Sequence, residues 1–245
     1  EDCFKRKLPY AVDVSCRFME AKIRFIVEET PFFESNFLVK EGMLFKDRFV
    51  GLFGLVGLNE CVNILMEKAG KADKYGHTQE ANSLGKRIIE AIDRQVASFD
   101  SKYSSYRGNR FMMHSQVGAC GDNGVTPGVR IAIGSEPELY DHIRQAGTLH
   151  PYFPSGIGDI FPFEVTAARN PEAIVDIIKG AFKNGMHYIS VYASNSDVIR
   201  VTGYLIKKSE MNKYKAGDAV LNSAVSSSEE TVTCRHVYDR KVERI

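Results

Sequence analysis

The chain lacks long apolar runs and lacks an excess of charge of either sign. Its 245 residues include 32 basic and 31 acidic side chains, a formal charge of +1, and 44% of them are hydrophobic. No uninterrupted apolar run reaches the roughly 18 residues of a transmembrane helix, so no membrane partner is expected. Without surplus positive charge to hold phosphates, nucleic-acid binding is also excluded as the main function. The composition predicts one large or two small core-forming domains.

Cysteine and histidine patterns typical of metal sites are also missing. The five cysteines stand at positions 3, 16, 61, 120 and 234 and include no CxxC pair. The thiolate spacing of structural zinc and iron–sulfur sites is therefore absent. The six histidines form neither HxH nor HExxH, and we expect no metal site. An odd number of cysteines in a chain of this size favours reduced thiols and a cytoplasmic location.

An initiator methionine and a charged-then-apolar leader are missing as well, because the sequence opens at Glu1. This beginning predicts a processed or excised chain. Such a chain has enough apolar residues for a core, but that core need not be complete.

Helical and strand patterns alternate along the chain, which favours an α/β architecture. Predicted helices cover 17–29, the segment after a cap at Asn59, 84–99, 137–147 and 171–184. Predicted strands cover 159–165, 187–192 and 198–206, while 49–58 reads as a buried strand or a loop through a core. We expect loops with short strands at 101–126, and the same for the polar tail after Lys207.

The segment Arg200-Val201-Thr202-Gly203-Tyr204 stands out in the last part of the chain. From composition alone, a glycine inside a β-branched run indicates a bulge or a point of close packing. The segment nevertheless resembles RVxGY, the signature that glycyl radical enzymes carry near their C-terminus.

Three further segments occur in the order found in anaerobic (class III) ribonucleotide reductases and their relatives. Residues 54–60 (GLVGLNE) resemble a GxxGLNE segment, residues 134–151 resemble the stretch after the substrate-side strands, and residues 156–184 resemble the strand and NPEA helix before the glycyl loop. Within this group the chain is most similar to the YjjI-type glycine radical proteins. Residues 191–200 contain no cysteine, although the reductases carry two CxxC pairs for zinc at the matching place.

The resemblance implies a fold that the alternating pattern alone does not specify. It is part of the ten-stranded α/β barrel of glycyl radical enzymes, formed by two five-stranded half-sheets around a finger loop. The chain would supply the C-terminal half with the glycyl radical loop. Residues 1–150 would form a barrel segment with helices, and residues 151–245 the C-terminal glycyl radical domain. The exposed half-barrel would then need its missing N-terminal half or a second copy as a partner.

The resemblance also implies radical chemistry. Gly203 would store the radical, and Arg200, Val201 and Tyr204 would hold the loop in place. The family has no permanently bound cofactor, because a radical S-adenosylmethionine (SAM) activating enzyme installs the radical. The stored radical would take hydrogen from a cysteine thiol, and the thiyl would attack a small-molecule substrate under anaerobic conditions.

Cys61 follows Asn59 and Glu60 at a predicted strand-to-helix junction. A thiol beside the positive end of a helix is a candidate thiyl cysteine, with Asn59 and Glu60 on the substrate side. The alternative is that Cys61 begins a buried helix face, and that the thiyl cysteine lies upstream of this chain. His150 and Glu164 lie in matched segments, as site residues or, more simply, as a half-buried histidine and a surface glutamate.

The sequence is also compatible with three other functions. An anaerobic ribonucleotide reductase-like enzyme is one alternative, although the missing CxxC pairs argue against it. A non-catalytic spare radical domain that docks on an oxygen-damaged enzyme is another, although such domains are much smaller. The last is a structural α/β remnant that has lost its radical function.

Overall fold

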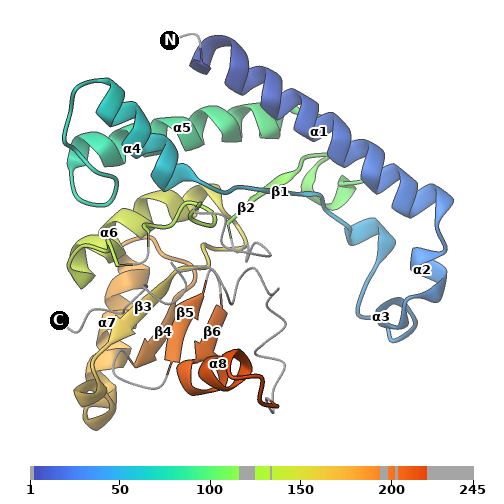
Figure 1. Ribbon diagram of the computed structural model, residues 1–245. Coiled ribbons are helices and arrows are strands. Elements are labelled where there is room, and N and C mark those ends of the chain that lie inside the picture. The colour runs from blue at the N-terminus through green and yellow to red at the C-terminus, as the bar shows by residue number, and fades with distance from the viewer. Residues whose placement is uncertain (1–2, 116–124, 133, 194–197, 202–203, 220–245) are drawn as a thin grey trace. The chain divides into compact units, whose positions relative to one another are not determined.

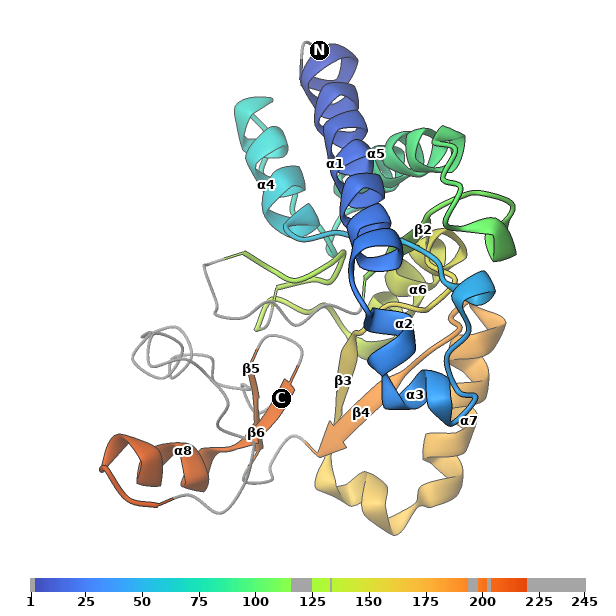
Figure 2. The same cartoon turned by 90° about the vertical axis from the view of Figure 1, so that its right-hand side faces the viewer.

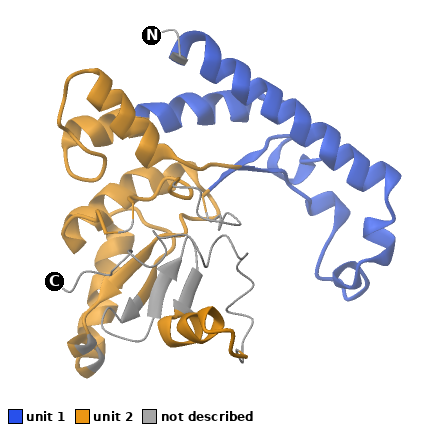
Figure 3. Ribbon diagram, in the orientation of Figure 1, with its two compact units in different colours: residues 1–53, 87–114 blue, residues 54–86, 115–245 orange. Residues whose placement is uncertain are grey.

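The computed structural model describes residues 3–115, 125–132, 134–193, 198–201 and 204–219 (Figure 1). These residues form a mixed α/β structure that is mostly helical, with helices and strands alternating as expected. The chain divides into two compact units, residues 1–53 with 87–114, and residues 54–86 with 115–245 (Figure 3). The predicted division at residue 150 stays a prediction.

Unit 1 is built around one long helix. Its elements are α1 (Leu8–Arg24), the flanking π-helical turns Cys3–Lys7 and Phe25–Glu29, the short helices α2 (Phe32–Ser35) and α3 (Phe37–Lys40), and 3₁₀ turns at Lys46–Arg48 and Ser105–Arg107. Strand β1 (Leu52–Gly54) pairs with β2 (Met112–His114), and α5 (Gln79–Ser98) contributes its second half. The predicted helix at 17–29 is confirmed, but helical structure begins earlier, because Pro9 fits the first turn.

One face of α1 is buried within unit 1, and hydrogen bonds fasten it there. Val12, Cys16 and Ile23 are the buried residues of the helix. The Gln95 side chain donates to the Pro9 carbonyl over 2.5 Å, which ties α5 to the start of α1. This buried face follows the three-to-four spacing that predicts an amphipathic helix.

Unit 2 contains most of the strands. Its helices are α4 (Leu58–Lys68), the first half of α5, α6 (Leu139–Leu149), α7 (Pro171–Lys183) and α8 (Lys208–Lys215), with 3₁₀ turns at His150–Tyr152 and Val165–Arg169. Its strands are β3 (Ile160–Phe163), β4 (Ser190–Ala193), β5 (Val198–Val201) and β6 (Tyr204–Lys207). The strands predicted at 159–165 and 187–192 and the helices predicted at 84–99, 137–147 and 171–184 are confirmed, with small shifts of their ends.

Strands β3 and β4 are parallel, and α7 is the crossover between them (Figure 2). Ile160 pairs with Ser190 and Phe163 with Ala193. A core fills the space between α6, β3 and α7, formed by Ile143, Ala146, Phe161, Phe163, Ala181 and Met186. Helix α7 begins at Pro171, as predicted, and the Asn170 side chain caps it by accepting a hydrogen bond from the Ala173 N–H.

Three local predictions are wrong. Segment 49–58 forms only the three-residue strand β1 and is not buried throughout, since Val56 is 57% exposed. Helix α4 is not capped by Asn59: Gly57 precedes it with φ +82°, and Asn59 is a buried residue of the first turn. Directly after Lys207 the chain forms helix α8 rather than loops and strands, with an ion pair of Lys213 and Glu210, while the tail from residue 220 lies outside the described residues.

The described residues contain three two-stranded sheets and do not show the expected ten-stranded barrel. The finding is therefore the coarser one, a mixed α/β arrangement. Among the described helices, none combines the length and apolar character needed to cross a membrane.

Helix α6 approaches the end of α7 closely enough to require glycine. A Cβ added at Gly147 would lie 2.0 Å from the carbonyl oxygen of Asn184, which ends α7. Gly185 follows with φ +92°, and a Cβ there would lie 3.1 Å from the Gly147 oxygen. Two backbones are therefore in direct contact, with no room for a side chain between them.

We predict that Gly147→Ala destabilises the protein, because the new methyl group forces α6 away from α7. In urea unfolding of the full-length protein, the free energy of unfolding should fall by about 1–3 kcal/mol. Gly180→Ala in α7 is the matched control, since a Cβ at that helical glycine meets nothing within 4 Å. The control should raise stability by up to about 1 kcal/mol, and equal effects of both changes would contradict the packing described.

Candidate functional site

The two strands on either side of Thr202 and Gly203 are paired antiparallel. In the pairing of β5 with β6, Val198 is opposite Lys207 and Val201 is opposite Tyr204. The single strand predicted at 198–206 is therefore two strands, connected by Thr202 and Gly203. These two residues lie outside the described residues, as do the side chains of Arg200, Val201 and Tyr204. Gly203 thus stands between the last paired positions of two strands, rather than within one.

The GLNE segment forms the start of α4 and packs on residues 125–128. Gly57 turns the chain into the helix with φ +82°. Its N–H donates to the Thr126 carbonyl over 2.8 Å, and the Gly128 N–H donates to the Leu55 carbonyl over 3.0 Å. A Cβ at Gly57 would lie 2.9 Å from Val125, so a glycine is needed for this approach as well.

Glu60 lies in the first turn of α4, and its two carboxylate oxygens differ in their hydrogen bonding. Its Oε1 accepts hydrogen bonds from the Asn59 amide, over 3.1 Å, and from the Thr126 hydroxyl. Its Oε2 is buried and has no hydrogen-bond partner among the described residues. Buried polar atoms are normally paired, so this oxygen can accept a hydrogen bond from a further group. The first turn of a helix also favours a negative charge.

Two cysteine side chains are described, and their environments differ. Cys61 in α4 is exposed, so the expectation that it begins a buried helix face is wrong. Cys16 in α1 is buried, and burial followed by the charge of Asp13 raises the pKa of its thiol to about 11. At neutral pH the Cys16 thiol is therefore protonated and unreactive. The side chain of Cys3, and Cys120 and Cys234, lie outside the described residues.

Arg130 is a buried cation that the sequence analysis did not single out. It is 2% exposed, and it donates to the carbonyls of Pro127, over 3.2 Å, and Gly158, over 2.8 Å. It thus connects the segment beside Glu60 to the segment that leads into β3. An arginine at this position carries no local motif, and only the fold brings its two partners together.

His142 and Asp159 form a second buried polar pair without a sequence signal. The Nε2 of His142 lies 2.6 Å from Asp159 Oδ2, and both side chains are at most 3% exposed. Asp159 Oδ1 accepts from the Ile160 N–H over 2.9 Å. The pair joins α6 to the beginning of β3, and its carboxylate is satisfied on both oxygens.

His150 is fully buried rather than half-buried, whereas Glu164 is exposed, as its simpler interpretation predicted. His150 Nδ1 accepts a hydrogen bond from the His187 N–H over 3.1 Å, so the neutral ring carries its proton on Nε2. That Nε2 is buried and has no hydrogen-bond partner among the described residues. Burial, followed by the neighbouring His187, lowers the pKa of His150 to about 4.

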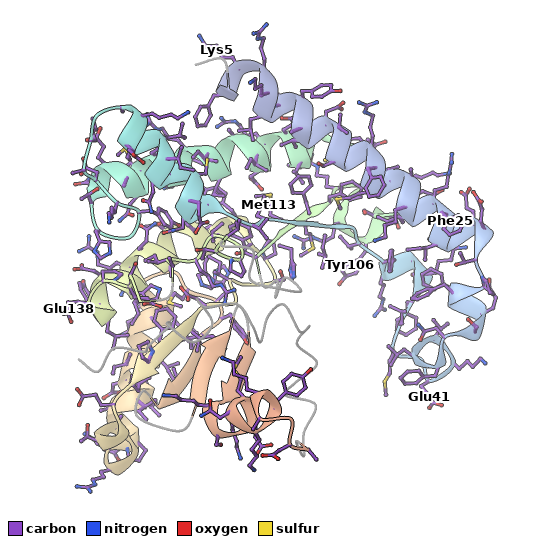
Figure 4. The ribbon with its side chains drawn as sticks, viewed as in Figure 1. Lys5, Phe25, Glu41, Tyr106, Met113 and Glu138 are labelled. Carbon is purple, nitrogen blue, oxygen red and sulfur yellow. The ribbon has the colours of Figure 1, made fainter. Side chains whose placement is uncertain are left out.

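A polar cleft of about 780 Å³ opens between the first half of α5 and α6. Its volume is within the range of small-molecule pockets. Its lining mixes the carboxylates of Glu138 and Asp141 with the basic side chains of Lys86 and Arg144 (Glu138 is labelled in Figure 4). Such a mixture selects neither anions nor cations. In the part of the chain that the structure describes, no three His, Cys, Asp or Glu residues come together as a metal site would require.

We predict that His150 makes stability depend on pH between about 6.5 and 4. In this range the unfolded histidine binds a proton but the folded one does not, so unfolding takes up a proton. The free energy of unfolding should therefore fall as the pH falls from 6.5 to 4, by up to about 3 kcal/mol. His150→Asn should reduce this slope, because the variant has no titrating ring at this position and the Asn oxygen can still accept from the His187 N–H.

Urea unfolding of the full-length protein at several pH values measures this slope. The matched control is His77→Asn, a change at an exposed histidine, which should leave the slope unchanged. If His150→Asn keeps the slope of the parent protein, another group is responsible.

Comparisons with known proteins agree with the segments described above. The family model "Glycyl radical enzyme YjjI-like" matches residues 1–243. An uncharacterized protein of Haemophilus influenzae is 37% identical over 245 residues, covering 99% of this chain and 48% of that protein. The uncharacterized protein YjjI of Escherichia coli K12 is 40% identical over 223 residues, covering 91% of this chain and 43% of that protein.

Among solved structures, an anaerobic ribonucleotide reductase has a similar fold. The TM-score is 0.60 at 15% identity, over 91% of this chain and 42% of the reductase chain. At this identity the likeness concerns the fold alone. The chain spans about half the length of the curated relatives it matches. With a family match over nearly all of its residues, the chain belongs to the YjjI-like family of glycyl radical enzymes.

Proposed function

We propose that this chain carries the radical-storing part of a glycyl radical enzyme, with the radical on Gly203. The observation that carries the proposal is the β5–β6 register, in which Val201 pairs with Tyr204. In a member of this family, that register leaves the glycine of RVTGY at the connection of two strands. Arg200, Val201 and Tyr204 belong to the strands on either side and hold the loop.

Glycine suits this task for physical reasons. Loss of one α-hydrogen leaves a carbon radical between an amide nitrogen and a carbonyl group, and both groups delocalise the unpaired electron. A side chain would crowd the flattened centre and oppose its geometry, whereas glycine has none and accepts unusual backbone angles.

The radical requires a partner that generates it. A radical SAM activating enzyme removes one hydrogen atom from the Gly203 α-carbon. The stored radical then takes a hydrogen atom from a cysteine: the S–H bond breaks, the C–H bond of Gly203 re-forms, and a thiyl radical remains. The thiyl radical in turn takes a hydrogen atom from a small-molecule substrate. The protein positions these groups and keeps water and oxygen out, so the reaction is anaerobic.

Cys61 is the thiyl candidate within the described residues, because its side chain is exposed at the start of α4. Asn59 and Glu60 lie in the same turn, on the substrate side. The buried Glu60 Oε2, which has no hydrogen-bond partner among the described residues, would accept a hydrogen bond from a hydroxyl or ammonium group of the substrate. The parallel pair β3–β4 would be part of the ten-stranded barrel, completed by the missing N-terminal half or by a second copy.

We predict a glycyl radical signal at Gly203. The full-length protein, activated anaerobically by its radical SAM partner, should give a doublet in electron paramagnetic resonance, because one α-hydrogen remains on the radical carbon. Protein grown with α-deuterated glycine should lose the doublet splitting. Gly203→Ala should abolish the signal, whereas Gly180→Ala should retain it. A doublet in the Gly203→Ala variant would refute the assignment.

A second prediction concerns Cys61. If its thiol exchanges a hydrogen atom with the Gly203 radical, solvent deuterium reaches the glycine through the thiol. In D₂O the doublet should then collapse in the parent protein and persist in Cys61→Ser, with the radical yield unchanged. Cys16→Ala is the matched control and should collapse like the parent, since Cys16 is buried. Collapse in Cys61→Ser would assign the thiyl to another cysteine while leaving the radical on Gly203.

A further inference from the structure

Helix α1 carries apolar side chains on two opposite faces. Its buried face is packed within unit 1, as described above. On the other side lies an exposed stripe, which consists of Tyr10, Val14, Phe18 and Phe25. Successive helical residues are turned by about 100°, so steps of four and seven residues keep all four on one side. Phe25 stands in the π-helical turn that continues the helix (Figure 4).

The exposure of this stripe is unusual for a surface helix. Tyr10 is 70% exposed, Phe18 68% and Phe25 53%. A helix on the surface of a globular protein has one apolar face, and a helix that is apolar on both sides is normally covered on both. Among the described residues of unit 1, nine large hydrophobic side chains are exposed: Tyr10, Val14, Phe18, Phe25, Phe37, Met43, Phe45, Leu52 and Tyr106.

The borders of the stripe are polar. Asp13 and Arg17 form an ion pair at 2.9 Å along one border of the stripe, and Lys22 lies along the other border. An apolar centre with a charged border is the composition of a protein interface. On soluble proteins, a large exposed apolar patch with a polar border marks a site of interaction with another surface.

We infer that the exposed stripe of α1 is covered by the part of the full-length protein that lies outside these 245 residues. The two curated relatives match 99% and 91% of this chain, yet the chain covers 48% and 43% of them. More than half of each relative is therefore further polypeptide. A segment of the same polypeptide meets the stripe at an effective concentration near millimolar, which a second copy of the protein does not reach.

The covering of the stripe does not depend on the radical at Gly203, and unit 1 is covered in the same way whether or not the protein is activated.

Photocrosslinking identifies the segment that covers the exposed stripe of α1. The full-length protein is produced with p-benzoylphenylalanine in place of Phe18, irradiated, digested and analysed by mass spectrometry. We expect crosslinks within one polypeptide, to peptides outside these 245 residues. The same probe at Lys22, on the polar border of the stripe, is the matched control and should give fewer of these crosslinks.

Mixing copies labelled with ¹⁴N and ¹⁵N identifies crosslinks between two molecules. Crosslinks that join a ¹⁴N to a ¹⁵N copy would overturn the inference in favour of a dimer interface. Crosslinks confined to residues 54–86 or 115–245 would overturn it in favour of coverage by unit 2. An absence of crosslinks at position 18 would show that the stripe faces solvent.

Stability provides a second, independent measurement. Phe18→Glu should lower the thermal midpoint of the full-length protein by several degrees, because a charge enters an apolar contact. Ser15→Glu, at an exposed polar position of the same helix, should change it by about a degree or less. An unchanged midpoint in Phe18→Glu would overturn the inference.

Discussion

The direct contact of two backbones, at Gly147 in α6 and Asn184 at the end of α7, is the constraint from which the arrangement of unit 2 follows. The contact lies at the end of α7, where Gly185 with φ +92° turns the chain back towards β4. His150, which directly follows α6, accepts a hydrogen bond from the His187 N–H on its Nδ1. This bond holds the segment between α7 and β4 in place. Strand β4 can then pair in parallel with β3, and the chain proceeds to the β5–β6 pair.

A second set of contacts holds the polar groups near α4. At the start of the helix the Gly57 N–H donates to the Thr126 carbonyl and the Gly128 N–H donates to the Leu55 carbonyl, and Arg130 joins that segment to the residues before β3. Glu60 is fixed by Asn59 and Thr126, so its side chain is held in place without a ligand. Groups that are already oriented lose less conformational entropy on binding, which would favour the role proposed for Glu60 on the substrate side.

Local sequence predicts those elements whose signals are local. The start of α7 at Pro171, the apolar stripe of α5 and the β3 strand are confirmed, and the RVTGY and GLNE segments identify the family. The sequence does not predict helix α8, because Met211 is its one buried residue and the helix therefore has no apolar periodicity. The predicted cap at Asn59 is wrong because Gly57, which has a positive φ, precedes the helix and Asn59 lies within its first turn. Arg130 and the His142–Asp159 pair depend on contacts between distant segments, which no local pattern encodes.

The burial of Cys16 has a consequence for measuring motion in this protein. Its thiol lies on the inner face of α1 with a pKa raised to about 11, so alkylating reagents reach it only when the helix lifts from its neighbours. Exposed Cys61 reacts without such an opening. A change in the ratio of the two alkylation rates therefore reports a change in how often α1 detaches.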